Sequence, residues 1–415
     1  MKTMKFKPSE VGPVPVDWEV KRLGGCCKKI GSGATPTGGA TVYLSHGVSL
    51  IRSQNVYNGY FKYEGLAHIT DSAASALDGV TVQDDDVLLN ITGDSVARCT
   101  KVPADVLPAR VNQHVAIIRT CSEELGSDYL QCYLASPDMQ TYMLNAASGQ
   151  GGSRNAMTKG MVEDFQIPIP PLPEQKAIAE ALSDVDALLA AITKLIEKKR
   201  AIKQGAMQEL LTGKKRLAGF TGKWVEKRLG DVVEINPSLE SVIPEKFVYV
   251  DLESVAGGRL LERKLVLRER APSRAQRRFV QGDILFQTVR PYQRNNLLVG
   301  FDAANYVAST GYAVIRGRAL CSCSEFIYHI IHVDDFVNGV LDRCTGTSYP
   351  AINPGKLAEI IVRIPEAVAE QKAIASVLSD MDAEIAALEA TRAKYESIKQ
   401  GMMQELLTGK TRLSV

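Results

Sequence analysis

One stretch of this sequence occurs twice. The segment "IKQGAMQELLTGK" at 202–214 returns as "IKQGMMQELLTGK" at 398–410, with one residue changed in thirteen. Aligning Glu174 with Glu370, an offset of 196, extends the match over 44 residues without a gap and with 28 identities. A repeat of this kind has to be explained before any fold is assigned. The chain is therefore expected to contain one structural unit twice.

A weaker form of the repeat extends outside this segment. The only two tryptophans open the two halves, in "DWEVKRLGG" (17–25) and "KWVEKRLGD" (223–231). Three further pairs recur at offsets of 195 to 197: "DVLLNIT" (86–92) with "DILFQTV" (283–289), "VAIIR" (115–119) with "YAVIR" (312–316), and "GGSRNAMTKG" (151–160) with "GTSYPAINPG" (346–355). The pattern predicts a tandem duplication, in which a variable, strand-rich globule precedes a nearly invariant helix.

The repeated segment has the periodicity of a long helix. Apolar residues are spaced by four and three in both copies, as in the seam of a coiled coil: Ile178, Leu182, Val185, Leu189, Ile192 and Ile196, then Ile374, Leu378, Met381, Ile385 and Leu388. Pro173 suits the first turn of a helix and Gly213 suits its end. About 40 residues in each copy would span roughly 60 Å.

The remaining sequence is typical of small mixed sheets. Segments 80–119 and 247–316 alternate short β-branched runs with Gly, Pro, Asn and Asp turns, which predicts strands with peripheral helices. The predicted fold class is α+β. Its predicted parts are a globule at 1–170, a helix at 171–216, a second globule at 217–366 and a second helix at 367–415.

Composition excludes several classes of protein. No run of about 18 apolar residues is present, and the first residues lack the apolar middle of a signal peptide, so a cytoplasmic protein without membrane contact is expected. The eight cysteines include no CxxC pair, which argues against a zinc ribbon or a disulfide scaffold. The formal net charge of +2 neither favours nor excludes a polyanionic partner.

The sequence lacks a strong enzymatic signature. "TGKT" (408–411) has Gln404 where a P-loop needs Gly, and "KIGSGATP" has Pro36 where GxGxxG needs its third Gly. "INPS" (235–238) and "INPG" (352–355) lack the NPPY pattern of amino-methyltransferases, and Asp251 with "ERK" (262–264) only loosely imitates a nuclease motif. His329 and His332 could share a metal, but a solvated helix face is the expected arrangement. No metal site or cofactor is predicted in this chain.

Positive charge is concentrated in the second half. From Arg259 to Arg294 the chain holds ten Arg and Lys against three acidic residues, a balance of +7 in 36 residues. The run ends in "VRPYQRNN", which combines donors for phosphates with donors for base edges. The first half has a weaker version in "IRSQNVYNGYFKYE" (51–64) and "SGQGGSRNAMTKG" (148–160). These segments predict nucleic-acid contacts, and the alternative is a solvated charged surface.

With these features together, the chain resembles the specificity subunits of type I restriction-modification systems. The resemblance covers nearly the full length and rests on these segments: "SGATP" (32–36), "DVLLNITGDSVARCTKVP" (86–103), "VNQHVAIIR" (111–119), "IPIPPLPEQKAIAEALSDVDALL" (167–189), "GDILFQTVRPYQRN" (282–295), "TGTSYPAINPGKL" (345–357) and the second "EQKAIA". One departure is "RIPEAVAEQ", which replaces a proline-rich lead into the second helix.

The resemblance implies an architecture and a set of partners. Each globule would be a target-recognition domain for one half of a split sequence in double-stranded DNA, and the two helices would pair antiparallel with pseudo-two-fold symmetry. The helices would also bind two methyltransferase subunits, which use S-adenosylmethionine, and restriction subunits that use ATP and Mg would join them. The chain itself would be non-catalytic. The alternatives are an enzyme with its own methyltransferase or nuclease module, and a purely structural coiled-coil adaptor.

The residues expected to act fall into two groups. The predicted DNA contacts are Arg52, Gln54, Asn55, Arg154, Lys159, Arg274, Arg277, Arg278, Arg290, Tyr292, Gln293, Arg294, Asn295, Ser348 and Tyr349. The predicted contacts with the methyltransferase are Lys203, Gln204 and Gly205 in the first helix, and Lys399, Gln400 and Gly401 in the second. The half-site sequences themselves do not follow from the residues.

Overall fold

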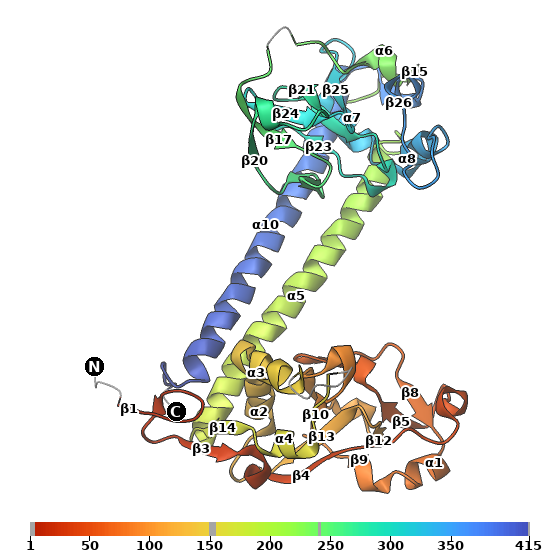
Figure 1. Cartoon of the computed structure of the whole chain (residues 1–415). Helices are drawn as coiled ribbons and strands as arrows, with labels where there is room; N and C mark the ends of the chain where they lie inside the picture. The colour runs from red at the N-terminus through yellow and green to blue at the C-terminus, as the bar shows by residue number, and fades with distance from the viewer. Residues whose placement is uncertain (1–4, 149–154, 240–241, 414–415) are drawn as a thin grey trace. The chain divides into compact units, whose positions relative to one another are not determined.

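The chain forms two compact units that share its two long helices. The computed structural model describes residues 5–148, 155–239 and 242–413. One unit comprises 1–193 with 390–415, and the other comprises 194–389. Both boundaries fall inside a long helix, α5 (Leu172–Leu210) or α10 (Val368–Leu406) (Figure 1). Each unit therefore contains one globule, the beginning of one long helix and the end of the other.

The first globule contains two four-stranded sheets. The inner sheet has the order β11-β10-β13-β4 and is antiparallel throughout, whereas the outer sheet has the order β8-β5-β12-β9 with β5 and β12 parallel. The strands are β4 (Cys27–Ser32), β5 (Val48–Ile51), β8 (Ala67–Ile69), β9 (Thr81–Val82), β10 (Val87–Asn90), β11 (Cys99–Lys101), β12 (Ala109–Val111) and β13 (Val115–Thr120).

The second globule repeats this topology strand for strand. Its inner sheet has the order β23-β22-β25-β16, and its outer sheet has the order β20-β17-β24-β21 with β17 and β24 parallel. The strands are β16 (Val233–Ile235), β17 (Lys246–Val250), β20 (Lys264–Leu267), β21 (Ala275–Arg278), β22 (Ile284–Gln287), β23 (Leu297–Leu298), β24 (Tyr306–Ser309) and β25 (Tyr312–Gly317). The predicted duplication therefore includes the globules, although their sequences have diverged.

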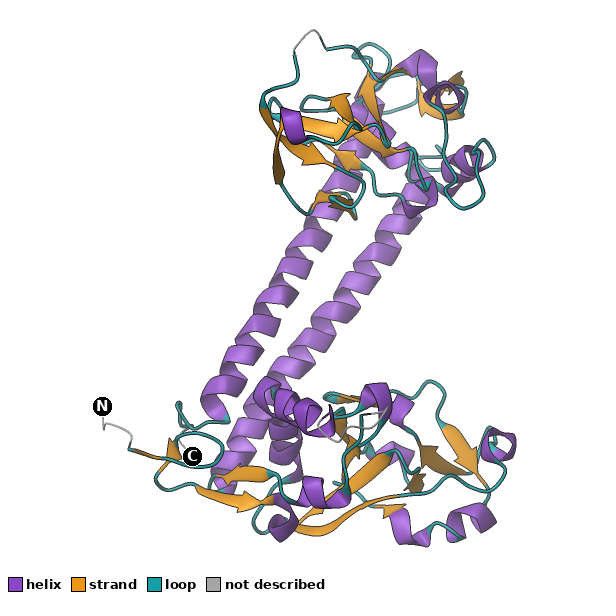
Figure 2. Cartoon of the chain, viewed as in Figure 1, coloured by secondary structure: helices purple, strands orange, loops and turns teal. Residues whose placement is uncertain are grey.

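Short strand pairs and helices complete each globule (Figure 2). The pairs are β1 (Phe6–Lys7) with β2 (Val14–Pro15), β3 (Glu19–Arg22) with β14 (Gln166–Ile169), β6 (Val56–Tyr57) with β7 (Tyr60–Phe61), β15 (Trp224–Arg228) with β26 (Ile361–Pro365), and β18 (Val255–Ala256) with β19 (Arg259–Leu260). The short helices are α1 (Asp71–Ser75), α2 (Ser127–Leu134), α3 (Pro137–Ser148), α4 (Lys159–Glu163), α6 (Leu229–Val232), α7 (Ser324–Ile330), α8 (Asp334–Leu341) and α9 (Pro354–Ala358). The single-turn 3₁₀ helices are η1 (Leu23–Cys26), η2 (Gly39–Val42), η3 (Ser53–Asn55), η4 (Asp78–Val80), η5 (Gly93–Ser95), η6 (Ala104–Val106), η7 (Arg268–Arg270) and η8 (Pro291–Gln293).

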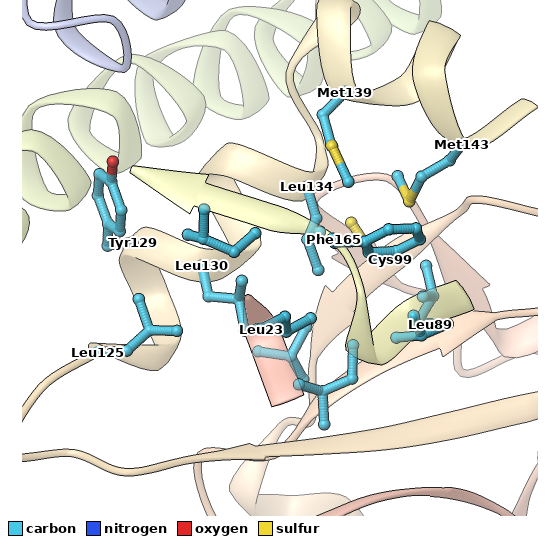
Figure 3. Close-up of a cluster of buried hydrophobic side chains, with 14 of the residues drawn as sticks. Leu23, Leu89, Cys99, Leu125, Tyr129, Leu130, Leu134, Met139, Met143 and Phe165 are labelled. Carbon is cyan, nitrogen blue, oxygen red and sulfur yellow. The ribbon is translucent and has the colours of Figure 1, made fainter. Parts of the chain in front are cut away.

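Each globule shares its core with the long helices. In the first unit, Ile178 and Leu182 of α5 and Met403 and Leu406 of α10 belong to the cluster that contains Phe165. Figure 3 shows the globular part of this cluster, where Leu134 of α2, Met143 of α3 and Cys99 of β11 lie near Phe165. The second unit builds the equivalent cluster with Leu210, Leu211, Ile374 and Leu378. The beginning of one helix packs beside the end of the other, so the helices run antiparallel within each unit.

A buried glutamate near the start of one long helix binds the segment that follows the other long helix in each unit. In the first unit, Glu174 of α5 accepts hydrogen bonds from the guanidinium of Arg412 (2.5 and 2.7 Å) and from the Trp18 indole N–H (3.2 Å). In the second unit, Glu370 accepts the same bonds from Arg216 (2.5 and 2.7 Å) and Trp224 (3.4 Å). Both arginines also lie over the indole rings. The repeated Trp, Glu and Arg residues therefore form the same hydrogen-bonded cluster in each unit.

The glutamine after each of these glutamates fixes the helix to its own globule. The Gln175 side chain accepts a hydrogen bond from the Gly126 N–H (2.8 Å) and donates to the carbonyls of Glu124 and Pro170. Gln371 does the same with the Cys323 N–H (3.0 Å) and the carbonyls of Cys321 and Pro365. Because both amides are buried and fully bonded, their removal would leave backbone groups unpaired.

Two structural features explain why a glycine follows each long helix. Gly213 and Gly409 adopt φ of +69° and +68°, the left-handed conformation that ends many helices and favours glycine. A Cβ on Gly213 would lie 3.0 Å from the Trp224 ring, and a Cβ on Gly409 would overlap Pro15. Each glycine therefore ends its helix and lets a tryptophan pack against the chain.

The structure corrects the expectation for His329. This side chain is buried on α7, where its Nε2 lies 3.4 Å from the Ser379 hydroxyl of α10, rather than on a solvated face. Burial lowers the pKa of His329 to about 4, and the nearby Lys203 ammonium contributes in the same direction. Burial also lowers the pKa of His332. The core of the second unit thus contains an imidazole that stays neutral when folded.

Because His329 is buried in its neutral form, we expect acid to lower the free energy of unfolding of the second unit selectively. The pKa of His329 is about 4 in the folded chain and near 6.5 in the unfolded chain, so stability is lost as pH falls through that window. From pH 7 to pH 5 the wild type is expected to lose about 2 kcal/mol more unfolding free energy than H329Q. Urea unfolding followed by Trp224 fluorescence in a W18F background measures this, and equal losses would contradict it.

Candidate nucleic-acid interface

In the second globule, two distant loops join at the end of strand β22. The Arg290 N–H donates to the Pro350 carbonyl (2.7 Å), the Ile352 N–H donates to the Thr288 carbonyl (3.0 Å), and Val289 forms a β-bridge with Ala351. The Thr310–Gly311 turn connects this loop to the outer sheet, since the Thr288 N–H donates to Gly311 and the Thr310 N–H donates to Arg274. We call residues 288–296 with 345–353 the second reading loop.

Arg290 has the features of a ligand-binding side chain. Its backbone is left-handed with φ of +53°, a conformation that costs energy for a residue other than glycine and that occurs often at functional sites. Its guanidinium lies 4.3 Å from the ring centre of Tyr349, which is 66% exposed. Arg290 Nε is buried and has no hydrogen-bond partner in the described structure. The side chain is thus held by stacking and keeps unused donors.

The other predicted residues of this loop differ in their availability. Arg294 is also left-handed, but its guanidinium donates to the His332 carbonyl (2.9 Å) and pairs with Asp334 (2.6 Å). The Gln293 side chain accepts a hydrogen bond from buried Gln287, whose own oxygen accepts from the Asn295 N–H. Tyr292 and Ser348 are exposed. Arg294 therefore supports the loop, while Tyr292, Ser348 and Tyr349 form its accessible surface.

The arginines of strand β21 lie on the outer sheet. Arg278 donates to the carbonyls of Val242 (2.9 Å) and Ala304 (3.2 Å), and both Arg277 and Arg278 keep a buried Nε without a partner in the described residues. Arg274 is exposed, and its carbonyl accepts the bond from Thr310 described above. At the start of the basic run, Arg259 pairs with Glu389 (3.0 Å). Some arginines of the basic run, such as Arg278 and Arg259, are thus bonded within the protein, whereas Arg274 is exposed and can donate hydrogen bonds to a ligand.

The first globule builds the equivalent pair of loops. The Ile91 N–H donates to the His114 carbonyl (3.0 Å), and the Met157 N–H donates to the Ile91 carbonyl (2.8 Å). Thr92 forms a β-bridge with Ala156, and the Gly93 N–H donates to the Asn155 carbonyl. The Ile91–His114 bond corresponds to the Thr288–Gly311 bond at the offset of 197. We call residues 91–98 with 155–158 the first reading loop.

A cavity of about 390 Å³ opens beside the first reading loop. It is lined by Ser53, Gln54, Tyr57, Thr92, Gly93, Asp94, Ser95, Arg98 and His114. The Arg98 guanidinium lies 4.6 Å from the ring centre of Tyr57, and the Thr92 hydroxyl lies 2.5 Å from His114 Nδ1. An arginine stacked on a tyrosine therefore lies at the reading loop of both globules, although the two tyrosines come from different segments.

The predicted contacts of the first globule are only partly brought together. Gln54 lines the cavity, and Lys159 follows the segment that pairs with the loop. Arg52 donates to the Gly65 carbonyl (2.6 Å), lies over Tyr43, and has a buried Nε without a partner in the described residues. Arg154 lies outside the described residues.

Asn55 corrects the prediction. Its side chain is fully buried, accepts from the Arg52 N–H and donates to the Lys62 carbonyl. It therefore stabilises η3 and has no surface with which to contact DNA in this structure. From a run of polar residues in the sequence, a side chain that forms hydrogen bonds within its own turn cannot be distinguished from one that points into solvent.

Several residues at the first reading loop were missed by sequence reasoning. They are Thr92, Asp94, Arg98 and His114, whereas Tyr57 lies within the predicted segment 51–64 but was not singled out. The available signal was the alignment of "DVLLNIT" with "DILFQTV", since residues that follow equivalent strands occupy equivalent loops. The acidic composition of 63–97, with seven acidic residues and no Lys or Arg, is instead typical of a surface that turns away from DNA or towards a basic partner. Arg98, which lines the cavity, stands directly after this segment.

The predicted partner-binding residues occupy two kinds of position on the helices. Lys203 pairs with Asp382 and Lys399 pairs with Asp186, both at 2.5 Å, so these lysines join the two long helices within each unit. Gln204, Gly205, Gln400 and Gly401 are exposed. A Cβ added at either glycine would meet no heavy atom within 4 Å. The helices therefore present the same open face once in each unit.

The described part of the chain shows neither a cluster of metal ligands nor an activated thiol among its most buried cysteines. Across residues 5–148, 155–239 and 242–413, no three His, Cys, Asp or Glu side chains are arranged to hold a metal ion. Burial raises the pKa of Cys27 and of Cys132 to about 12, so these thiols remain protonated and weakly nucleophilic near neutral pH. No described helix combines the length and the apolar character that membrane crossing requires.

Comparison with known proteins identifies one family. The sequence model of the type I restriction modification DNA specificity domain matches residues 15–204 and 221–400. The type I restriction enzyme MjaVIII specificity subunit of Methanocaldococcus jannaschii is 24% identical over 437 residues, which cover 99% of this chain and 97% of that protein.

Solved structures agree with this at the level of the fold. The S subunit of a type I restriction-modification system from M. genitalium aligns with a TM-score of 0.61 and 14% identity, covering 97% of this chain and 98% of that one. A chain from a structure of an assembled type I R-M system aligns with a TM-score of 0.56 and 19% identity, covering 96% and 99%. Because the family model matches both halves, the chain belongs to the family of type I restriction-modification specificity subunits, which recognise DNA.

Proposed function

We propose that this chain reads a DNA target in two parts, one with each globule, and holds the catalytic subunits of the complex without catalysing a reaction itself. The observation that carries the proposal is the pair of reading loops. The two loops follow equivalent strands, β10 and β22, of the two inner sheets, and each is bridged by a segment that precedes the next long helix. Their side chains nevertheless differ. One framework with two sets of side chains suits two different half-site sequences.

The chemistry of the second reading loop suits duplex DNA. Arg290 offers unused donors beside exposed Tyr349, and a guanidinium can form two hydrogen bonds with a guanine edge. Arg274 and Arg277 of the outer sheet can neutralise phosphates, which position a protein on DNA without reading its sequence. The solvated-surface alternative predicts that these residues contribute nothing to binding.

The open faces of the long helices suit one partner bound twice. Gln204 with Gly205 and Gln400 with Gly401 lie at equivalent positions in the two units, and equal surfaces bind equal subunits. We assign these faces to two methyltransferase subunits, with restriction subunits joining them. S-adenosylmethionine, ATP and Mg would be bound by those partners.

The proposal predicts that methyl transfer depends on the partner. The isolated chain is expected to bind DNA in a salt-dependent way, to leave S-adenosylmethionine unbound and to methylate nothing. Adding the methyltransferase subunit is expected to give adenine methylation. G205W with G401W is expected to reduce assembly, whereas R22A, an exposed arginine of the first globule outside both long helices, is the control. Methylation by the isolated chain would contradict the proposal, and the absence of salt-dependent DNA binding would favour a structural adaptor.

The proposal also predicts different effects for the two left-handed arginines. R290A is expected to weaken binding to the second half-site by about 1–3 kcal/mol and to relax one base position. R294A is expected to weaken matched and mismatched DNA alike, because its guanidinium already supports the loop through His332 and Asp334. Titration of the complex against single-base variants of its target measures both. Unchanged affinity and salt dependence in both variants would show that this surface does not contact DNA.

A further inference from the structure

The cavity of the first globule contains charged groups of both signs that remain free. In the described residues, the Arg98 guanidinium has no hydrogen bond or ion pair, and its contact is the stack on Tyr57. The Asp94 carboxylate is exposed and also has no partner there. The two side chains line the same cavity without pairing to each other. A donor fork and an acceptor are therefore both available to a ligand.

The local structure holds Arg98 in a defined position. Ala97 before it is left-handed with φ of +73°, which a residue with a Cβ adopts only when its surroundings impose it. The Asn90 N–H donates to the Arg98 carbonyl (2.8 Å), and the Arg98 N–H donates to the Ser95 carbonyl (3.2 Å). Tyr57 is itself stacked on Tyr60, with ring centres 4.9 Å apart. Little conformational freedom of the backbone remains to be lost on binding.

The opposite charges of Arg98 and Asp94 determine which part of a DNA duplex the cavity can bind. A phosphate would be repelled by Asp94, so the cavity does not suit the backbone. The major-groove edge of a G·C pair instead presents the acceptors O6 and N7 of guanine beside the N4 amino donor of cytosine. A guanidinium matches the two acceptors, and a carboxylate matches the donor. Both complementary groups of one base pair are thus present on this loop.

We propose that Arg98 and Asp94 read one G·C base pair in the half-site of the first globule, with Arg98 on guanine and Asp94 on cytosine. Tyr57 is the positioning residue for Arg98. This assignment rests on the proposed function, because it requires that the first globule reads a half-site. It adds the identity of one base pair and of the two side chains that select it.

The test uses the complete system in cells and maps methylated adenines for the wild type, R98A, D94A and R22A. The wild-type half-site of the first globule is expected to contain at least one G·C pair. R98A and D94A are both expected to relax that pair, and the other half-site is expected to stay unchanged. R22A is the matched control, because Arg22 is an exposed arginine of the same globule that pairs with Asp164 at 3.3 Å.

Binding of the assembled complex to single-base variants then measures the effect. Preference for G·C over A·T at the relaxed position is expected to fall from about 5- to 150-fold in the wild type to about one in R98A. D94A decides the question if R98A fails to assemble, since Asp94 is exposed and removing its side chain breaks no described contact.

Three results would overturn the inference: a first half-site made only of A·T pairs, D94A or R98A methylating the same sites as R22A, or relaxation confined to the other half-site. In each case the target would still have two parts, so the proposed function would stand. Methylation without any two-part target would instead reject the proposed function.

Discussion

R412A is expected to lower the free energy of unfolding of the first unit by about 3–5 kcal/mol. The variant leaves the Glu174 carboxylate buried with one hydrogen bond, from Trp18, where the wild type has two further bonds from Arg412. Arg412 also donates twice to Asp17, and these hydrogen bonds lower the pKa of Asp17. Urea unfolding followed by Trp18 fluorescence in a W224F background measures the loss.

The repeated architecture provides its own controls. R216A is expected to destabilise the second unit by a similar amount, because Arg216 holds buried Glu370 in the same way. R412A combined with E174Q is expected to recover most of the loss, since a neutral amide can stay buried beside Trp18. R22A removes an exposed ion pair, for which about 0–1 kcal/mol is expected. If R412A matched R22A, the buried pair would not hold the helix ends together.

Lengthening both long helices by four residues is expected to widen the gap between the half-sites by one or two base pairs. Duplicating "KLIE" (194–197) in α5 and "ATRA" (390–393) in α10 places the insertions where the two units meet, so every contact within a unit is kept. Four residues add about 6 Å and rotate the helix by about 40° beyond one turn. At about 3.4 Å per base pair, this length corresponds to one or two base pairs.

The rotation makes this prediction specific to the insertion length. Two inserted residues in each helix would rotate the apolar seam by about 200°, and are expected to abolish assembly or methylation. Maps of methylated adenines for both insertions measure the outcome. An unchanged gap in the four-residue variant, or altered half-site letters, would mean that these helices do not set the spacing.

The repeated helix and its period were predictable because a heptad pattern depends only on residue spacing. The duplicated topology of the globules was also indicated, by the short matches around β10 and β22. The reasons for the individual repeated residues required coordinates. Glu174 pairs with an arginine 238 positions away, and this contact between the two copies of the repeated segment cannot be seen in either copy alone. The repetition of the two tryptophans is explained only by the structure, in which each indole N–H donates to one of the buried glutamates.

The candidate site was harder to predict than the fold. Composition located the arginines of the second globule but could not separate Arg290, which keeps free donors, from Arg294, which is bonded to its own loop. In the first globule it selected Asn55, which is buried, and did not select Arg98, which lines the cavity. His329 was expected in solvent and lies in a core. These errors share one cause, since the direction and burial of a side chain, in a loop or on a short helix such as α7, depend on distant segments that a local pattern does not contain.

The most direct test of this account is a map of methylated adenines in DNA from cells that carry the complete system. The account predicts a single target made of two specific parts separated by a constant number of unspecified base pairs. It further predicts that R290A alters only one part and R98A only the other. An uninterrupted target, or both variants altering the same part, would contradict the claim that the two globules read DNA independently at a fixed spacing.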